Sequence, residues 1–176
     1  METSDLEVPP LEFFERDAVS VAQALLGCYL ISTIGNRDDP VGGRIVETEA
    51  YTAGDPASHS FPGKTTRNGS MFLAGGTLYV YLIYGVHYCL NVVTGPPGVG
   101  EAVLLRAFEP VWGVEQMARR RGRPLPLAPD TETGGRTVGR NALRGIADGP
   151  GKIARALGAT DREDRTSLRQ GPVRIL

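Results

Sequence analysis

The sequence is poor in cysteine, histidine and lysine. Its 176 residues include two cysteines and two histidines, and lysine occurs only at Lys64 and Lys152. Cys28 and Cys89 both lie in apolar, strand-like runs, which is typical of buried thiols and not of a disulfide or a metal site. We therefore expect no metal and no other cofactor.

A long hydrophobic run is also missing. The apolar segment 21–34 is interrupted by Gln23, Gly27 and Tyr29, so it is too broken to span a bilayer. The acidic first seven residues lack the basic end and the apolar stretch of a signal peptide. We expect a protein without membrane contact that stays in the cytoplasm.

Neither sign of charge is in large excess, but the charges are unevenly distributed. The net charge is −1, whereas residues 1–55 hold eleven Asp and Glu against three Lys and Arg, and residues 106–155 hold ten Lys and Arg against five Asp and Glu. This asymmetry permits one basic face on a nearly neutral protein. With 41% hydrophobic residues, the chain can bury one sizeable core, and we expect a single domain over residues 1–176.

Residues 76–106 are the most informative stretch. Aromatic and β-branched residues predict two strands that fold back at Tyr84, Gly85 and Val86, and a third strand after a Gly/Pro loop. Tyr84 lies at the turn, where a large ring faces water unless a partner covers it. It is therefore a candidate for binding.

The length of this turn decides what the hairpin presents. A two-residue turn places Tyr81 opposite Tyr88 and leaves Asn91 on the other face. A three-residue turn pairs Tyr81 with Cys89 and Tyr79 with Asn91, so that two tyrosines and an amide share one face. The second register predicts the wall of a pocket, and tyrosines packed beneath a helix are the alternative.

The other elements follow from capping residues, alternation and turn residues. In chain order we expect a helix at 18–26 capped by Asp17, strands at 28–34 and 41–51, a loop at 60–75, a strand at 101–108, a helix at 111–121, a flexible loop at 122–140, a short helix at 153–157 and a last strand at 172–176.

Two further patterns carry candidate chemistry. Glu47 and Glu49 lie two residues apart in the strand at 41–51, so they share a face, and Tyr51 and His59 follow within ten residues of Glu49. Most such acidic pairs are simply solvated. Lys152 follows a Gly-rich turn at a helix start, which either binds a phosphate or only begins the helix, and the spacing excludes a Walker motif.

Several motifs occur in one order along the chain. They are residues 43–51, the Asp-x-Ala-x-His run at 55–59, Arg67-Asn68-x-x-Met71-Phe72, the hairpin at 78–91, the strand at 102–110 and Gly149-Pro150-x-Lys152. Together they closely resemble the alkyladenine DNA glycosylase family, also called mammalian-type 3-methyladenine DNA glycosylases, over roughly residues 15–160.

This resemblance implies an activity and a fold. The activity is hydrolytic removal of alkylated or deaminated purines (3-methyladenine, 7-methylguanine and hypoxanthine) from duplex DNA, the first step of base excision repair. The fold is α+β (mixed α/β), a single compact domain with a curved antiparallel β-sheet flanked by helices and a protruding β-hairpin. The implied partner is double-stranded DNA with a damaged purine, and we expect a monomer that is nucleoid-associated if bacterial.

The resemblance also implies roles for individual residues. Glu49 resembles the carboxylate that activates water, and Arg106 the arginine beside that water. The residues that resemble the pocket for the flipped base are Tyr51, His59, Tyr81 and Asn91. Those that resemble DNA contacts are the wedge Tyr84, its neighbours Gly85 and Val86, and Lys152. Val86 replaces a larger residue often found beside the wedge, so we expect a thinner plug.

Other functions remain to be separated from this one. Neither lysine lies in a pocket motif, so we expect no Schiff base and hence no strand cleavage. The His-x-Glu and Pro-Cys-x-x-Cys signature of zinc deaminases is absent from the sequence. A non-catalytic damaged-DNA or RNA-binding module that uses the same aromatic hairpin is the main alternative, and it would not need Glu49. A globular α+β domain without such a function is the third.

Overall fold

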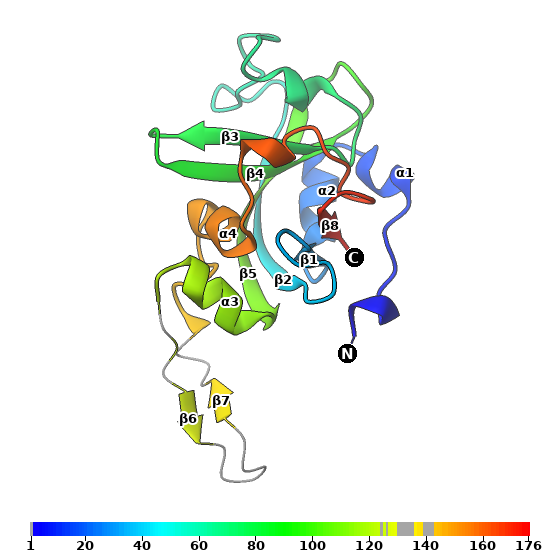
Figure 1. Ribbon diagram of the computed structural model, residues 1–176. Helices are drawn as coiled ribbons and strands as arrows, with labels where there is room; N and C mark the ends of the chain where they lie inside the picture. Colours follow the sequence, from blue (N-terminus) through cyan, green and yellow to red (C-terminus); the bar gives the residue numbers. More distant parts are fainter. Residues whose placement is uncertain (1, 124, 126, 130–135, 139–142) are drawn as a thin grey trace.

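A curled antiparallel sheet of six strands forms the centre of the protein, as the computed structural model shows (Figure 1). The structure describes residues 2–123, 125, 127–129, 136–138 and 143–176. Along the sheet the strand order is β3-β4-β5-β2-β1-β8, and the β3–β4 pair protrudes from it as a hairpin (Figure 1). The predicted α+β fold with a curved sheet, flanking helices and a protruding hairpin is confirmed.

The elements have the following bounds. The strands of the sheet are β1 (Tyr29–Ser32), β2 (Val41–Tyr51), β3 (Leu78–Ile83), β4 (His87–Thr94), β5 (Glu101–Trp112) and β8 (Val173–Ile175). The helices are α1 (Leu11–Phe14), α2 (Ala18–Leu25), α3 (Val114–Arg120) and α4 (Pro150–Leu157), with 3₁₀ turns η1 (Thr3–Asp5), η2 (Gly69–Phe72) and η4 (Asp161–Glu163). Within the described part of the chain, every helix is too short or too polar to cross a membrane.

The two faces of the sheet differ because side chains alternate along each strand. On one face, the main core joins the sheet to α2, α3 and α4 through buried apolar side chains, which include Leu25, Leu90, Leu105, Met117 and Ile153. On the other face, a smaller cluster forms around Met71, Tyr79, Val93 and Ala102, with Tyr51, Phe72 and Tyr81 packed against it. The helices thus cover the first face, and the loop between β2 and β3 lies against the aromatic face.

The hairpin adopts the three-residue turn, so the second of the two registers is correct. Tyr79 pairs with Asn91 and Tyr81 with Cys89. At the tip, the Val86 amide donates to the carbonyl of Ile83 at 3.2 Å. The two residues between them have positive φ, +53° at Tyr84 and +71° at Gly85. A left-handed conformation is easy for glycine but unfavourable for tyrosine, by about 1–2 kcal/mol.

Helix α2 confirms its predicted cap. The Asp17 carboxylate accepts a hydrogen bond from the Ser20 amide at 2.9 Å, and α2 then runs to Leu25. The chain turns at Gly27, whose φ is +92°. Beyond it, β1 and β2 form the predicted antiparallel pair.

The boundary between β5 and α3 was predicted wrongly. We expected the strand to end at residue 108 and a helix to begin at 111, but β5 continues to Trp112 and α3 begins at Val114. The extension forms because β2 offers partners there, Gly43 opposite Pro110 and Gly42 opposite Trp112. The chain leaves the strand at Gly113, whose φ is +61°.

The flexible loop predicted at 122–140 contains a short strand pair. Its described part includes β6 (Leu127–Pro129) and β7 (Arg136–Val138), which pair antiparallel as a separate two-stranded sheet. Residues 124, 126, 130–135 and 139–140 lie outside the described residues. For these positions the predicted loop is untested.

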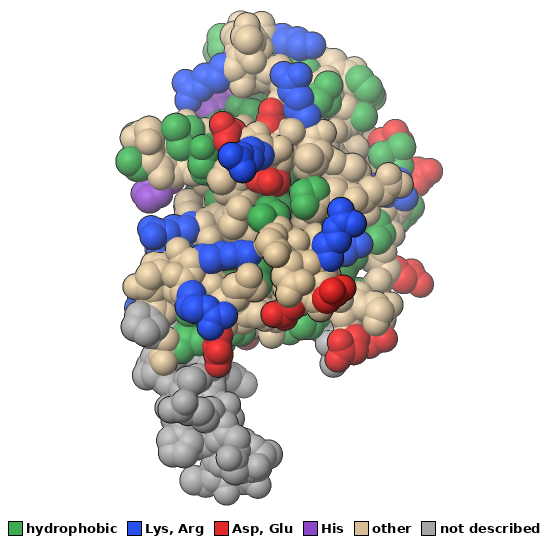
Figure 2. Space-filling view, viewed as in Figure 1, with side chains coloured by type: hydrophobic (Ala, Val, Ile, Leu, Met, Phe, Trp, Pro, Cys, Tyr) green, Lys and Arg blue, Asp and Glu red, His purple; other side chains and the backbone are tan. Residues whose placement is uncertain are grey.

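Surface charge follows the asymmetry of the sequence. In the view of Figure 2, Lys and Arg side chains lie over α3 and α4 below the hairpin, and Asp and Glu gather on the opposite side, near the N-terminal segment. The region of α3 and α4 thus carries a basic patch, on a face that as a whole shows charges of both signs.

The start of β2 requires glycine for steric reasons. A Cβ added to Gly43 would lie 1.9 Å from the backbone oxygen of Glu109 on β5, so the two strands could not keep their spacing. We expect Gly43→Ala to lower the free energy of unfolding by about 3 kcal/mol, measured by urea denaturation. Gly54→Ala is the matched control, because a Cβ there meets no atom within 4 Å. Equal unfolding midpoints for the two variants would contradict this account.

Candidate active site

A pocket opens on the aromatic face of the sheet. It brings together all four residues predicted to bind the base. Its lining consists of Tyr51, Tyr79, Tyr81 and Asn91 from the strands and Ala57, His59 and Met71 from the loop and turn between β2 and β3. The three-residue hairpin turn is what places the tyrosines of β3 and the amide of β4 on this one face.

In this pocket the His59 ring packs edge to face against both Tyr79 and Tyr81, while the two tyrosine rings are tilted by 33°. The His59 and Tyr81 ring centroids are 4.4 Å apart with an interplanar angle of 68°. Nδ1 of His59 lies 2.9 Å from the Tyr79 hydroxyl, within hydrogen-bond distance. Tyr79 was not among the predicted site residues, although the three-residue register placed it on the same face as Tyr81 and Asn91.

The lining carries no charge of its own at neutral pH. Burial raises the pKa of Tyr79 to about 12, and it also raises the pKa of Tyr81. His59 keeps contact with solvent, yet the partial burial of its ring and the nearby charge of Arg67 lower its pKa from 6.5. The pocket thus offers neutral, electron-rich rings, a surface that suits a flat and positively charged ligand.

Buried Asn68 holds the loop that carries His59. Its Nδ2 donates to the carbonyls of His59 at 2.7 Å and Gly63 at 3.0 Å, and its Oδ1 accepts from the Thr65 amide at 2.6 Å. Sequence reasoning quoted Asn68 only as part of a motif and assigned it no role. An amide inside a Gly- and Pro-rich loop was the available signal, because Asn side chains organise turns through backbone hydrogen bonds.

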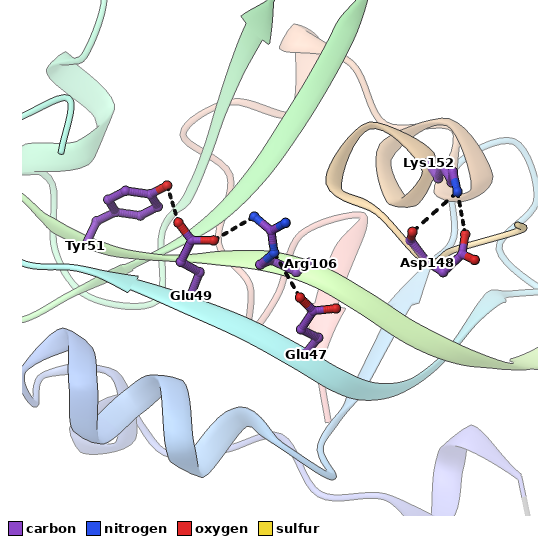
Figure 3. Close-up of polar contacts among 6 residues, drawn as sticks. All are labelled: Glu47, Glu49, Tyr51, Arg106, Asp148 and Lys152. Atoms are coloured by element: carbon purple, nitrogen blue, oxygen red, sulfur yellow. Dashed lines mark hydrogen bonds and ion pairs between the residues drawn. The ribbon is translucent and has the colours of Figure 1, made fainter. Parts of the chain in front are cut away.

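A chain of polar contacts at the edge of the pocket runs from Tyr51 to Glu49, then to Arg106 and on to Glu47 (Figure 3). Glu49 accepts from the Tyr51 hydroxyl through Oε1 at 2.5 Å and from Nη1 of Arg106 through Oε2 at 2.6 Å. Nε of Arg106 donates to Oε1 of Glu47 at 3.0 Å. The predicted catalytic pair, Glu49 and Arg106, is therefore in direct contact.

Arg106 compensates two negative charges on one face of β2. The hydrogen bond to Glu47 and the charges of both glutamates raise the pKa of Arg106, which stays a cation. Burial, followed by the hydrogen bond and charge of Glu49, raises the pKa of Tyr51 to about 12, so its hydroxyl keeps the proton it donates. The pairing with β5 is irregular on both sides of Glu47, and such bulges re-aim side chains near functional sites. The Glu49 side chain remains 38% exposed, within reach of water.

The predicted DNA contacts lie on two separate elements. Tyr84 and Val86 are 88% and 69% exposed at the hairpin tip, on either side of Gly85. Lys152 lies in the first turn of α4, where its Nζ is 2.7 Å from Oδ1 of Asp148, apart from the Glu49 and Arg106 contacts (Figure 3). Tyr84, Gly85 and Val86 thus lie together at the tip, and Lys152 lies on α4, whose Gly151 borders the hairpin at His87.

In the part of the chain that the structure describes, no group of three or more His, Cys, Asp or Glu side chains could hold a metal ion. Cys28 and Cys89 are free thiols.

Comparisons with known proteins found similar sequences. A family model described as methylpurine-DNA glycosylase (MPG) matches residues 12–176. A protein of Methanoculleus marisnigri named "Putative 3-methyladenine DNA glycosylase" is 48% identical over 94% of this chain and 76% of its own length. Proteins of the same name from Rhizobium johnstonii and Francisella tularensis are 46% and 39% identical over 84% and 85% of this chain, and the matches cover 61% and 68% of their lengths.

Proposed function

The chain belongs to the methylpurine-DNA glycosylase family, whose name denotes hydrolases of N-glycosidic bonds in DNA, and we propose that it excises alkylated or deaminated purines from duplex DNA. The substrates are 3-methyladenine, 7-methylguanine and hypoxanthine, each flipped out of the duplex. One observation carries this proposal. The Glu49 carboxylate is hydrogen-bonded to Tyr51, a residue of the pocket lining, so an acid lies at the edge of an aromatic pocket.

Binding of the flipped base uses the neutral rings. Tyr51 and Tyr81 offer aromatic surface for stacking, worth about 1–3 kcal/mol per base. A purine made cationic by alkylation gains further attraction from the ring faces. His59 and Asn91 supply the polar groups that accept or exclude exocyclic substituents, and these decide which purines fit.

Extrusion of the base needs a group that fills the space left in the duplex. Tyr84 suits this role because its ring is almost fully exposed and is held at a turn in an unfavourable left-handed conformation. Such strain at a tip is often associated with function. Inserted through the minor groove, the ring would hold the gap open, and unstacking costs a few kcal/mol, least at a weakly paired lesion.

Hydrolysis then uses Glu49 as a base. As the bond between the sugar C1′ and the purine nitrogen breaks, its electron pair leaves with the purine and positive charge develops on the sugar. The carboxylate stabilises that charge and takes a proton from the water whose oxygen attacks C1′. Arg106 and Tyr51 orient the carboxylate. An alkylated purine leaves as a neutral base, whereas hypoxanthine gains from protonation by an acid.

Neither lysine is placed for Schiff-base chemistry, which supports an activity without strand cleavage. Nζ of Lys64 lies 6.0 Å from the centroid of the Phe72 ring, and Lys152 pairs with Asp148. Neither residue lines the pocket. Water is therefore the nucleophile.

The test is an excision assay on duplexes that carry hypoxanthine or 7-methylguanine. We expect release of the free purine and an abasic site whose strand breaks only after alkali treatment. Tight binding to these duplexes without base release would favour a non-catalytic module instead. Strand breaks without alkali would contradict the hydrolytic route.

His59 makes the choice of substrate depend on pH. Because its pKa is below 6.5, it is neutral at pH 7 and becomes a cation in more acidic solution. That charge would repel cationic 7-methylguanine but not hypoxanthine. As the pH is lowered from 7 through the titration of His59, we expect the excision rate of 7-methylguanine relative to hypoxanthine to fall by about fivefold, after subtraction of the uncatalysed rate. The ratio should change much less in His59→Gln, and an equal fall in that variant would exclude this cause.

A further inference from the structure

A groove separate from the base pocket runs between the hairpin and α4. The hairpin side is formed by Val86, His87 and Tyr88, and the other side by Arg120 of α3, by Gly151, Ala154, Arg155 and Gly158 of α4 and its cap, and by Ala159 and Thr160. The groove shares no lining residue with the base pocket. Tyr88 and Asn91 are three residues apart on β4 and so point to opposite faces. The groove therefore opens on the face of the hairpin away from the pocket.

Two arginines supply the groove with positive charge that no acid balances. Arg155 is exposed and donates through Nε to the Arg120 carbonyl at 2.8 Å. Arg120 is held by Nη1 to the Ala156 carbonyl at 3.1 Å and Nη2 to the Ile34 carbonyl at 2.7 Å. Among the described residues, neither guanidinium forms an ion pair with a carboxylate.

The neighbouring charges add to this excess. Arg121 follows on α3, and its pKa is lowered first by burial and then by the charges of Arg155 and Arg123. Of the nearby acids, Asp148 pairs with Lys152, and Asp161 accepts from the hydroxyl of Tyr88 in the groove lining at 3.4 Å but pairs with neither arginine. In Figure 2 the same region shows Lys and Arg side chains gathered over α3 and α4. Such a surface favours an anion.

We propose that this groove holds the phosphate backbone of the duplex beside the lesion, with Arg155 as the main phosphate ligand. The proposal rests on the proposed function, because the duplex reaches the groove when Tyr84 enters it. Val86 lines the groove two residues from Tyr84, so DNA engaged by the wedge lies beside this opening. The Nη groups of Arg155, for which no hydrogen bond to another described residue is seen, suit a phosphate, and the fixed Arg120 adds charge without having to move. This contact strengthens binding and orients the duplex without touching the reacting atoms.

The salt dependence of DNA binding tests the charge. We expect Arg155→Gln to weaken binding to a lesion duplex about fivefold near 0.1 M salt and to reduce the slope of log K against log salt by about 1. Arg174→Gln is the matched control, because Arg174 lies on β8, at the opposite edge of the sheet from the hairpin. Identical slopes for the two variants would overturn the proposal. Arg155→Ala, which also removes the charge, is the second variant if Arg155→Gln does not fold, with the same change in slope expected.

Neutral methylphosphonates, placed one at a time along both strands, test the contact itself. At one or two adjacent positions beside the lesion, the substitution should weaken binding of the unaltered protein but not of Arg155→Gln. If no position behaves in this way, the proposal is overturned. Base release by the unaltered protein is measured on the same duplexes. If base release fails while the effects of Arg155→Gln on binding persist, the glycosylase proposal is wrong and the phosphate contact in the groove is retained. If base release is normal and Arg155→Gln has no effect on binding, only the phosphate contact is wrong.

Discussion

Replacing Glu49 with Gln is expected to lower the single-turnover rate of base release by about 10³-fold, within the range for loss of a general base. The amide has almost the same shape as the carboxylate but can neither take a proton from water nor balance charge on the sugar. Affinity for the lesion duplex should change little, because Glu49 lies at the edge of the pocket and is not part of its lining. Rapid-quench excision and fluorescence anisotropy measure the two quantities.

Glu47→Gln is the matched control for this experiment. Glu47 lies on the same strand and hydrogen-bonds the same arginine, Arg106, but the contact to Tyr51 belongs to Glu49 alone. We expect its rate to stay within about fivefold of the unaltered protein, since an exposed ion pair contributes little. Equal losses in the two variants would mean that Glu47 and Glu49 only stabilise the pairing of β2 with β5. Full activity in Glu49→Gln would contradict the proposed mechanism.

The second large effect is expected at the hairpin tip. Tyr84→Gly removes the exposed ring and should lower the excision rate from a paired duplex by about 100-fold, because the gap left by the flipped base is no longer filled. The loss should be smaller for a mismatched lesion, which is already weakly paired. Single-turnover rates on paired, mismatched and single-stranded substrates measure the difference.

Stability separates this effect from damage to the fold. Glycine adopts the positive φ of Tyr84 without strain but has more freedom in the unfolded chain, so the free energy of unfolding should remain within about 1 kcal/mol of the unaltered protein. Val86→Ala at the same tip is the control, and its excision rate should fall far less. A Tyr84→Gly variant that excises paired lesions at the normal rate would show that the ring is not a wedge.

Local patterns predicted the elements whose signals lie within a few residues. Asp17 and Gly27 marked α2, and the turn at 35–40 predicted a returning strand with the observed bounds of β2, Val41–Tyr51. The end of β5 failed because its last residues, Pro110 among them, resemble a helix start and become a strand only through pairing with Gly42 and Gly43 of β2. Strand ends depend on a partner, whereas a helix cap acts through its own neighbours.

The sequence by itself determined which residues had to be considered: one acidic strand, one aromatic hairpin, one exposed tyrosine and a basic segment, in the order that the family shares. Only the tertiary structure decided the hairpin register, the contact of Arg106 with both Glu47 and Glu49, the place of Tyr79 in the pocket and the groove beside Arg155. The physical reason is sequence separation. Arg106 lies 57 residues from Glu49, and a curled sheet, not local propensity, brings such positions within hydrogen-bond distance.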